Sequence, residues 1–173
     1  RKISFPKWII VVSATITALI NFLINLGVII VFALANGVAP RLTWLLVPFV
    51  VLELYLLSLG IAFFLGAINV KFRDISSIWE VFMQALFYAI PIIYPITMVA
   101  AASPSAAKIF LLNPIAQVIQ DARFLLITDQ TITTWNYLSE RFLHFIPLII
   151  VLFILALGGV YFRKRSKYFA EEA

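Results

Sequence analysis

Residues 8–40 read WIIVVSATITALINFLINLGVIIVFALANGVAP and contain no charged side chain. A helix needs about 20 predominantly apolar residues to cross the hydrocarbon of a bilayer. Lipid offers the backbone no hydrogen-bonding partner, so a crossing segment must satisfy its own backbone groups. This stretch therefore predicts a membrane-spanning helix with its core near residues 9–34.

The composition of the whole chain also indicates a membrane protein. Of the 173 residues, 64% are hydrophobic and 12% are charged, against roughly 25% charged in ordinary soluble domains. Three further stretches are long enough to cross the bilayer, and their cores are expected near residues 43–68, 80–101 and 144–162. The first of these stretches contains one charged residue, Glu53. We expect an all-α integral membrane protein of four transmembrane helices in a single domain, residues 1–173.

The distribution of basic residues predicts the orientation, because Lys and Arg near span ends resist translocation. With four spans both chain ends share a side. That side carries nine of the 13 basic residues: Arg1, Lys2, Lys7, Lys71, Arg73, Arg163, Lys164, Arg165 and Lys167. We therefore expect both ends and the turn at residues 70–80 to be cytoplasmic. The tryptophans fit these borders, since indole rings favour the membrane interface; they are Trp8, Trp44, Trp79 and Trp135.

The turn at residues 70–80 reads VKFRDISSIWE and is the most charged interior stretch of the chain. One interpretation is a hydrophilic loop whose Lys71 and Arg73 enforce topology. The other is a docking element for a partner protein. Asp74 suits a helix N-cap, and apolar residues recur after it at helical spacing. The basic, aromatic stretch RKISFPKW at residues 1–8 is a candidate second docking element.

The external region, residues 102–143, contains two helix-start signatures. SPSAAKIFLL and NPIAQVIQDARFLLI each begin with a capping residue followed by proline at the first helical position. Both apolar helices are too short to cross a bilayer. They either lie at the outer surface or dip into the membrane and return, and their spacing does not separate these alternatives.

Polar residues inside the predicted spans favour the protein interior or a water-filled path. In the first span Ser13, Thr17, Asn21 and Asn25 follow at four-residue steps, a pattern that also suits helix–helix hydrogen bonding. In the third span Glu80, Gln84 and Tyr88 repeat the four-residue pattern. Pro91 and Pro95 then interrupt the helix and free backbone carbonyls, which predicts a bend.

Glu53 is the one charge in the interior of a predicted membrane core, away from the ends of the span, which makes it a functional hypothesis. It lines an aqueous path, pairs with a neighbouring subunit, or serves a proton relay. Elsewhere, Gly60 with Gly66 and the pair Gly158 and Gly159 are expected to permit close helix packing.

Signatures of soluble chemistry are missing from the sequence. It contains no G-x-S-x-G, no H-E-x-x-H, no acidic cluster for a metal, and no G-x-x-x-x-G-K-[ST] phosphate loop. It also contains no cysteine, which excludes disulfides and thiolate metal sites. We expect no catalytic residues, no metal, no cofactor and no nucleic-acid partner. Energy for active transport would come from another subunit or from an ion gradient.

Four stretches together resemble a known family: the basic start followed by FP, VKFRDISSIWEVFMQALFYAIPIIYPI, LLNPIAQVIQDARFLL and GGVYFRKRSKYFAEEA. The chain is similar to the permease subunit of the type-2 ATP-binding-cassette exporters that move polysaccharide, O-antigen or teichoic acid. Family permeases are usually longer at the front, so the resemblance implies a C-terminal portion. It also implies a permease homodimer in the bacterial plasma (inner) membrane, bound to two ATPase subunits that bind the ATP.

The resemblance also assigns roles to residues. The loop that touches the ATPase matches Lys71, Phe72, Arg73, Asp74 and Ile75, and residues 1–7 match a second contact. The helices after Pro104 and Pro114 match an external re-entrant pair. A lipid-linked glycan needs hydrogen-bonding side chains and aromatic faces along its route, and the expected lining is Asn21, Asn25, Glu53, Tyr55, Gln84, Tyr88 and Tyr94.

Two other functions stay open. A gradient-driven carrier would depend on Glu53 and need no ATPase. A multi-span enzyme acting on lipid-linked sugars would carry an acidic or histidine-bearing catalytic loop.

Overall fold

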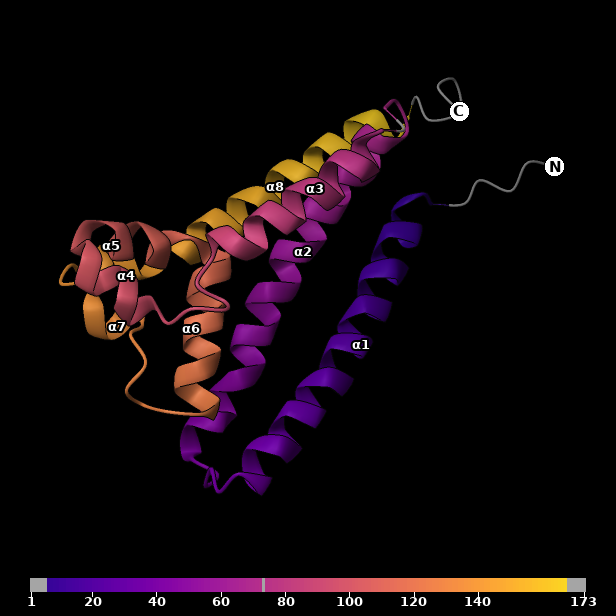
Figure 1. The fold of residues 1–173 in the computed structure, drawn as a ribbon. Helices are drawn as coiled ribbons and strands as arrows, with labels where there is room; N and C mark the ends of the chain where they lie inside the picture. Colours follow the sequence, from indigo (N-terminus) through magenta and orange to yellow (C-terminus); the bar gives the residue numbers. More distant parts are fainter. Residues whose placement is uncertain (1–5, 73, 168–173) are drawn as a thin grey trace.

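A computed structural model of the chain describes residues 6–72 and 74–167 (Figure 1). Its described part is helical and contains no strand. The elements in chain order are α1 (Trp8–Ala35), η1 (Leu42–Leu46), α2 (Val47–Asn69), α3 (Ile75–Ala89), α4 (Ile96–Ala102), α5 (Pro104–Leu112), α6 (Pro114–Leu126), α7 (Thr134–Tyr137), η2 (Arg141–Phe145) and α8 (Ile146–Arg165), where η marks a short 3-10 helix.

Three helical segments in the described part have the length and apolar composition of a membrane span: Trp8–Ala35, Leu42–Asn69 and Arg141–Arg165. A fourth candidate is the pair α5 and α6, which bends by 95° between Leu112 and Pro114. The predicted class is confirmed: the chain is an all-α integral membrane protein.

Helix α1 begins at one end of the molecule and runs away from it, and α2 and α8 run back to that end (Figure 1). The Nζ of Lys7, before α1, donates to the backbone oxygen of Ser166, after α8, at 2.6 Å. The two ends of the described chain therefore lie side by side. At the far end α1 stops in a Schellman turn, in which Val38 N–H donates to Ala33 O and Gly37 takes a φ of 84°.

The main packing contact is the crossing of α2 and α8. Gly60 of α2 lies so close to α8 that a Cβ atom there would stand 2.7 Å from Leu155 Cα. Gly158 in turn lies against the backbone of Gly60. Beyond the crossing, Phe63 and Phe162 bring their ring centroids within 5.2 Å. Small residues let two backbones approach without a side chain between them, which maximises van der Waals contact in lipid.

The glycine predictions have mixed outcomes. Gly60 and Gly158 form the close contact that was expected. At Gly66 an added Cβ atom would stand 3.5 Å from a Val11 methyl group of α1, an ordinary contact distance, so this glycine is not required for the approach of the two helices. A Cβ atom added at Gly159 would meet nothing within 4 Å among the described residues.

The third predicted span, residues 80–101, is not the single bent helix that was expected. Helix α3 begins at Ile75 and ends at Ala89, and α4 occupies Ile96–Ala102. Residues 90–95 between them are not helical. Pro91 and Pro95 lack the backbone N–H that would continue the helical ladder, so the interruption is complete where a bend was expected.

Both predicted helix starts in the external region are confirmed. The Ser103 side chain accepts from Ala106 N–H at 3.4 Å, and α5 begins with Pro104. The Asn113 side chain accepts from Ile115 N–H at 2.9 Å, and α6 begins with Pro114. The Asn113–Pro114 pair stops one helix and starts the next, which explains the right-angle bend between α5 and α6.

Candidate functional site

A polar cluster joins α2 to α6. Gln117 and Asp121 lie one turn apart on α6 and face α2. The Nε2 of Gln117 donates to Asp121 Oδ2 at 2.5 Å and to Glu53 Oε2 at 3.4 Å. Gln117 is 7% exposed, and its Oε1 has no partner among the described residues. One amide group therefore bridges two carboxylates from different helices and reduces their mutual repulsion.

This cluster changes the picture of Glu53. The sequence left three roles open for Glu53: lining an aqueous path, pairing with a neighbouring subunit, or serving a proton relay. The structure adds Gln117, a hydrogen-bonding partner within the same chain. Sequence reasoning did not connect Gln117 and Asp121 with Glu53, because the pairing depends on how α6 packs on α2. Their four-residue spacing was the one available signal. A pair of carboxylates with an amide between them can hold a proton or accept hydrogen bonds from hydroxyl groups.

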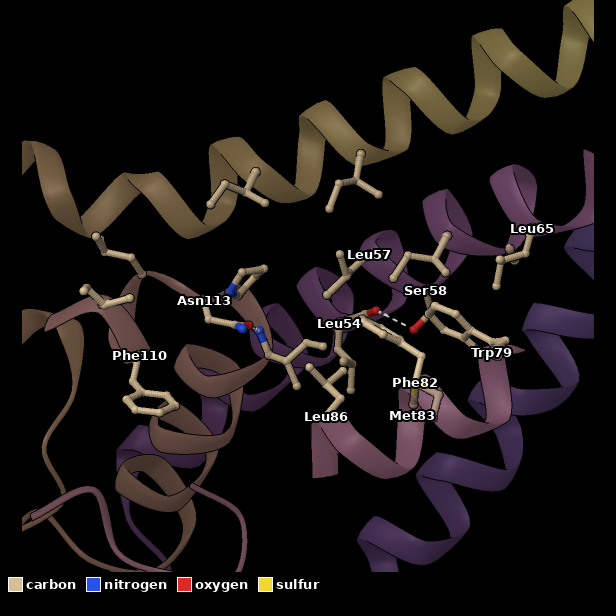
Figure 2. Close-up of a pocket in the computed structure, with 18 residues that line it drawn as sticks. Leu54, Leu57, Ser58, Leu65, Trp79, Phe82, Met83, Leu86, Phe110 and Asn113 are labelled. Carbon is tan, nitrogen blue, oxygen red and sulfur yellow. Dashed lines mark hydrogen bonds between the residues drawn. The ribbon is translucent and has the colours of Figure 1, made fainter. Parts of the chain in front are cut away.

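An apolar cavity of about 860 Å³ lies between α2, α3, α5, α6 and α8. Figure 2 shows its lining, in which Ser58 and Asn113 bring polar groups to walls made of leucine, isoleucine and aromatic side chains. Ser58 is already engaged, because its Oγ donates to Leu54 O at 2.9 Å. None of the seven predicted path residues lines this cavity. Tyr55 instead lines two smaller grooves, of 240 and 360 Å³, between α1 and α2.

The other predicted path residues lie on separate surfaces. Asn21 and Asn25 are exposed on α1, where Asn25 Nδ2 donates to Asn21 O at 2.8 Å. Gln84 and Tyr88 are exposed on α3. Tyr94 lies in the break after α3 and donates to Ala89 O at 3.1 Å.

In the described part of the chain, the Asn25–Asn21 bond is the one hydrogen bond between any two of the seven predicted path residues. The structure of one copy thus does not gather the seven around a common space. Their assignment to a path stays a prediction.

The loop between α2 and α3 lies at the end of the molecule that carries both termini (Figure 1). Lys71 Nζ stands 5.3 Å from the centre of the Phe72 ring, and that ring is 57% exposed. Asp74 occupies the N-cap position of α3 as predicted, although its side chain accepts no capping hydrogen bond, and Ile75 is the first residue of the helix. Arg73 lies outside the described residues. The described part of the loop is an exposed surface of mixed charge and apolar character.

The break between α3 and α4 is held by a residue that the sequence did not single out. Arg123 of α6 donates through Nη1 to Pro91 O at 3.3 Å and through Nη2 to Ile92 O at 2.5 Å. Ile90, Pro91 and Ile96 in and beside the break are buried. Irregular backbone at membrane depth is tolerated where protein covers it and its polar groups find partners. Arg123 supplies those partners.

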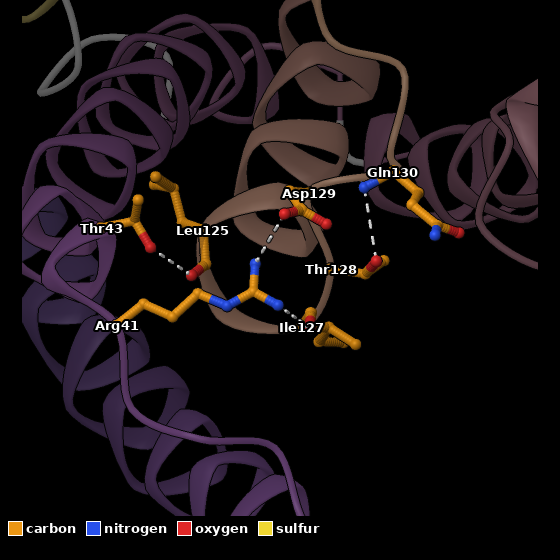
Figure 3. Close-up of polar contacts among 7 residues, drawn as sticks. All are labelled: Arg41, Thr43, Leu125, Ile127, Thr128, Asp129 and Gln130. Carbon is orange, nitrogen blue, oxygen red and sulfur yellow. Dashed lines mark hydrogen bonds and ion pairs between the residues drawn. The ribbon is translucent and has the colours of Figure 1, made fainter.

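A second set of contacts ties the turn before α2 to the end of α6 (Figure 3). Thr43 Oγ1 donates to Leu125 O at 3.0 Å. Arg41 lies 3.9 Å from Asp129 and also approaches Ile127 O at 3.5 Å. These contacts lie at the opposite end of the molecule from the termini (Figure 1). They fix α6 to the rest of the fold at its C-terminal end.

These features describe a membrane protein whose transmembrane helices carry a polar cluster and an apolar cavity, with an exposed loop at the end that bears the termini. The chain is similar to proteins named O-antigen export system permease protein RfbA. With one from Myxococcus xanthus it shares 33% identity over 119 residues, which are 68% of this chain and 45% of the relative.

Two such proteins from Klebsiella pneumoniae match almost the whole chain. One shares 28% identity over 173 residues and the other 27% over 172 residues, each match covering 99% of this chain and 62% of the relative. The chain thus spans less than two thirds of the length of these curated relatives. No protein-family model and no solved structure matches it. The resemblance that the sequence motifs indicated, to permeases of polysaccharide exporters, is confirmed.

Proposed function

We propose that this chain is the C-terminal portion of the permease subunit of an ATP-driven exporter, which moves a lipid-linked polysaccharide or a teichoic acid across the bacterial plasma (inner) membrane. The observation that carries the proposal is the similarity to O-antigen export permeases over 99% of the chain. The apolar helices agree with a transport subunit. The sequence has no phosphate-binding loop of its own, so a separate ATPase subunit supplies the energy.

The exposed loop after α2 is our candidate for the contact with that ATPase. Lys71, Phe72, Asp74 and Ile75 of this loop, with Arg73 between them, combine charge with an exposed aromatic ring, a mixture common at protein interfaces. We place this loop and both chain ends in the cytoplasm, because most basic residues lie at that end. ATP-driven closure of the partner would push on the loop and shift the helices between two packings. The permease acts as a homodimer in this proposal.

The proposed path for the glycan combines hydrogen-bonding and aromatic side chains from α1, α2 and α3. Its residues are Asn21, Asn25, Glu53, Tyr55, Gln84, Tyr88 and Tyr94. Four of these, Asn21, Asn25, Gln84 and Tyr88, are exposed in one copy, which supports a path completed by a second copy. Replacing Asn21 and Gln84 with leucine should block export; full export by that variant would remove both residues from the path.

The proposal is tested in the source bacterium by deleting the complete gene. We expect lipid-linked glycan to accumulate on the cytoplasmic leaflet and to reach the surface again when the gene is restored. The Arg73→Ala, Asp74→Ala double variant should insert and dimerise normally yet export nothing. Lys108→Ala, which removes an exposed charge from α5, is the matched control and should export normally. A deletion strain with unchanged surface glycan would overturn the proposal.

One observation favours a second function, a gradient-driven carrier. Glu53 and Asp121 share the Gln117 amide, and such an arrangement can hold a proton. Under this alternative Glu53→Gln abolishes transport and no ATPase co-purifies. Under the exporter proposal an ATPase co-purifies in fixed ratio and Glu53→Gln retains ATP-dependent export.

A further inference from the structure

A stacked aromatic pair, of which Trp135 is exposed and His144 is half-buried, lies in the segment between α6 and α8. The indole ring of Trp135 stacks on the imidazole of His144, with ring centroids 4.6 Å apart and an angle of 21° between planes. The same indole meets Phe145 edge to face, at 6.0 Å and 85°. Trp135 is nevertheless 62% exposed. The indole is therefore supported by protein on the side of His144, while most of the Trp135 side chain stays accessible to a ligand.

The backbone under Trp135 is fixed. Thr133 N–H donates to Asn136 Oδ1 at 2.6 Å, in a capping box that closes the short helix α7. On either side of the exposed ring, Thr134 is 1% exposed and Leu138 is 5% exposed. An exposed ring on a buried base loses little conformational entropy when a ligand covers it, which is the advantage of preorganisation.

An exposed charged residue shares a short helix with His144. Arg141 and His144 are three residues apart in the 3-10 helix η2, and side chains at that spacing lie one above the other. Arg141 is exposed. The segment that carries Trp135, ITDQTITTWNYLSER at residues 127–141, is rich in hydroxyl and amide side chains. The surface thus offers an exposed aromatic ring, and an exposed guanidinium lies on the same short helix as the histidine that supports the ring.

We propose that Trp135, supported by His144 and flanked by Arg141, is a sugar-stacking subsite. A pyranose ring presents C–H groups on its face and hydroxyl groups at its rim, which match an indole face and a guanidinium respectively. The subsite lies with α4, α5 and α7, at the end of α8 remote from the C terminus (Figure 1). This assignment rests on the proposed function. With both chain ends in the cytoplasm, the subsite faces outward and receives the glycan as the glycan leaves the membrane.

The competing interpretation is that Trp135 anchors the protein in the lipid interface, as exposed indoles often do. The two interpretations differ in what they require. A lipid anchor needs an apolar side chain at the interface, whereas a stacking subsite needs an aromatic plane. Leucine at position 135 keeps an apolar side chain for a lipid anchor but removes the aromatic plane that stacking needs. Phenylalanine keeps an aromatic plane, although a smaller one.

The experiment uses the complete permease in nanodiscs and, as probe, short lipid-free polysaccharide released by mild acid from the surface of the source bacterium. Ligand-observed NMR reports the affinity. We expect Trp135→Leu to weaken binding by about tenfold, since aromatic contacts of this kind contribute up to about 1.5 kcal/mol, and Trp135→Phe to retain most of it. Trp8→Leu is the matched control, because Trp8 is also exposed, at 52%, but is the first residue of α1, and this variant should bind as wild type does.

Arg141→Gln provides a second arm that leaves the aromatic pair intact, and we expect it to weaken binding several-fold. Equal affinity of the wild type, Trp135→Leu and Arg141→Gln would overturn the subsite, and so would a loss that depends on lipid composition and not on the sugar. The proposed function is tested separately, by the accumulation of glycan on the cytoplasmic leaflet of the deletion strain. If the deletion strain accumulates glycan while Trp135→Leu binds the sugar as tightly as wild type does, the subsite alone is refuted.

Discussion

Gly60 of α2 and Gly158 of α8 face each other at the helix crossing, so close that a methyl group on Gly158 would overlap the carbonyl oxygen of Gly60. The obstacle is backbone on both sides, which cannot rotate away as a flexible side chain does. The two glycines therefore set the distance between the two helices that support the rest of the fold.

Gly158→Ala should accordingly destabilise the protein. The helices must separate to admit the methyl group, and overpacking of this kind costs typically about 1–3 kcal/mol. Gly159→Ala, the neighbouring control, meets nothing within 4 Å and should be neutral or stabilising, because alanine favours a helix over glycine. Thermal unfolding in detergent measures both. Equal melting temperatures for the two variants would contradict the crossing.

Gln117→Leu removes the amide that bridges Glu53 and Asp121. We expect a loss of about 1–3 kcal/mol in the free energy of unfolding, the usual cost of leaving buried polar groups unsatisfied. Combining it with Glu53→Gln tests whether the two residues act together. If they do, the effect of the double variant differs from the sum of the single effects; strict additivity would show that the 3.4 Å contact contributes nothing.

Arg123→Gln should loosen the break between α3 and α4. Pro91 and Ile92 lose a charged donor, and hydrogen bonds to charged groups contribute about 1.5–3 kcal/mol each. We expect a lower melting temperature and faster hydrogen exchange at residues 90–95. Lys108→Gln removes the same charge from an exposed site on α5 and should leave both measurements unchanged. Unaltered hydrogen exchange at residues 90–95 in Arg123→Gln would show that this arginine does not stabilise the break.

The contacts in Figure 3 should differ in importance. Arg41 and Asp129 are 3.9 Å apart, with side chains 37% and 73% exposed, and exposed ion pairs contribute at most about 1 kcal/mol. Asp129→Asn should therefore change the melting temperature little. Thr43→Val should lower it more, since Leu125 O loses its donor. The reverse order would show that the charge pair is the main tie.

The proposed topology is accessible to labelling, because the 173 residues contain no cysteine. If the complete protein also lacks one, single cysteines at Asp74 and Asp129 report on the two ends of the fold. An impermeant maleimide added to intact cells should label Asp129→Cys and spare Asp74→Cys until the membrane is permeabilised. Labelling of Asp74→Cys in intact cells would reverse the orientation and remove the proposed ATPase contact.

Features set by local chemistry were predictable from the sequence. The charge-free run at residues 8–40 required a membrane helix, and α1 occupies most of it. Ser103–Pro104 and Asn113–Pro114 marked the starts of α5 and α6, because a capping side chain and a fixed proline φ act within a few residues. Prolines likewise indicated the interruption after α3, since each removes a backbone donor wherever the chain goes.

Features that depend on approach between distant segments were decided by the tertiary structure alone. Glycines could be marked as packing residues from the sequence. That Gly158 lies against Gly60, while a Cβ atom at Gly159 would meet nothing within 4 Å in the described part of the chain, follows from the rotation of α8 about its axis. Gln117 reaches Glu53 only because α6 packs on α2. A sequence states which side chains can bond or pack, because that is local chemistry. Which of them meet is fixed by helix packing, where many weak contacts over the whole length of each helix outweigh the preference of any one residue.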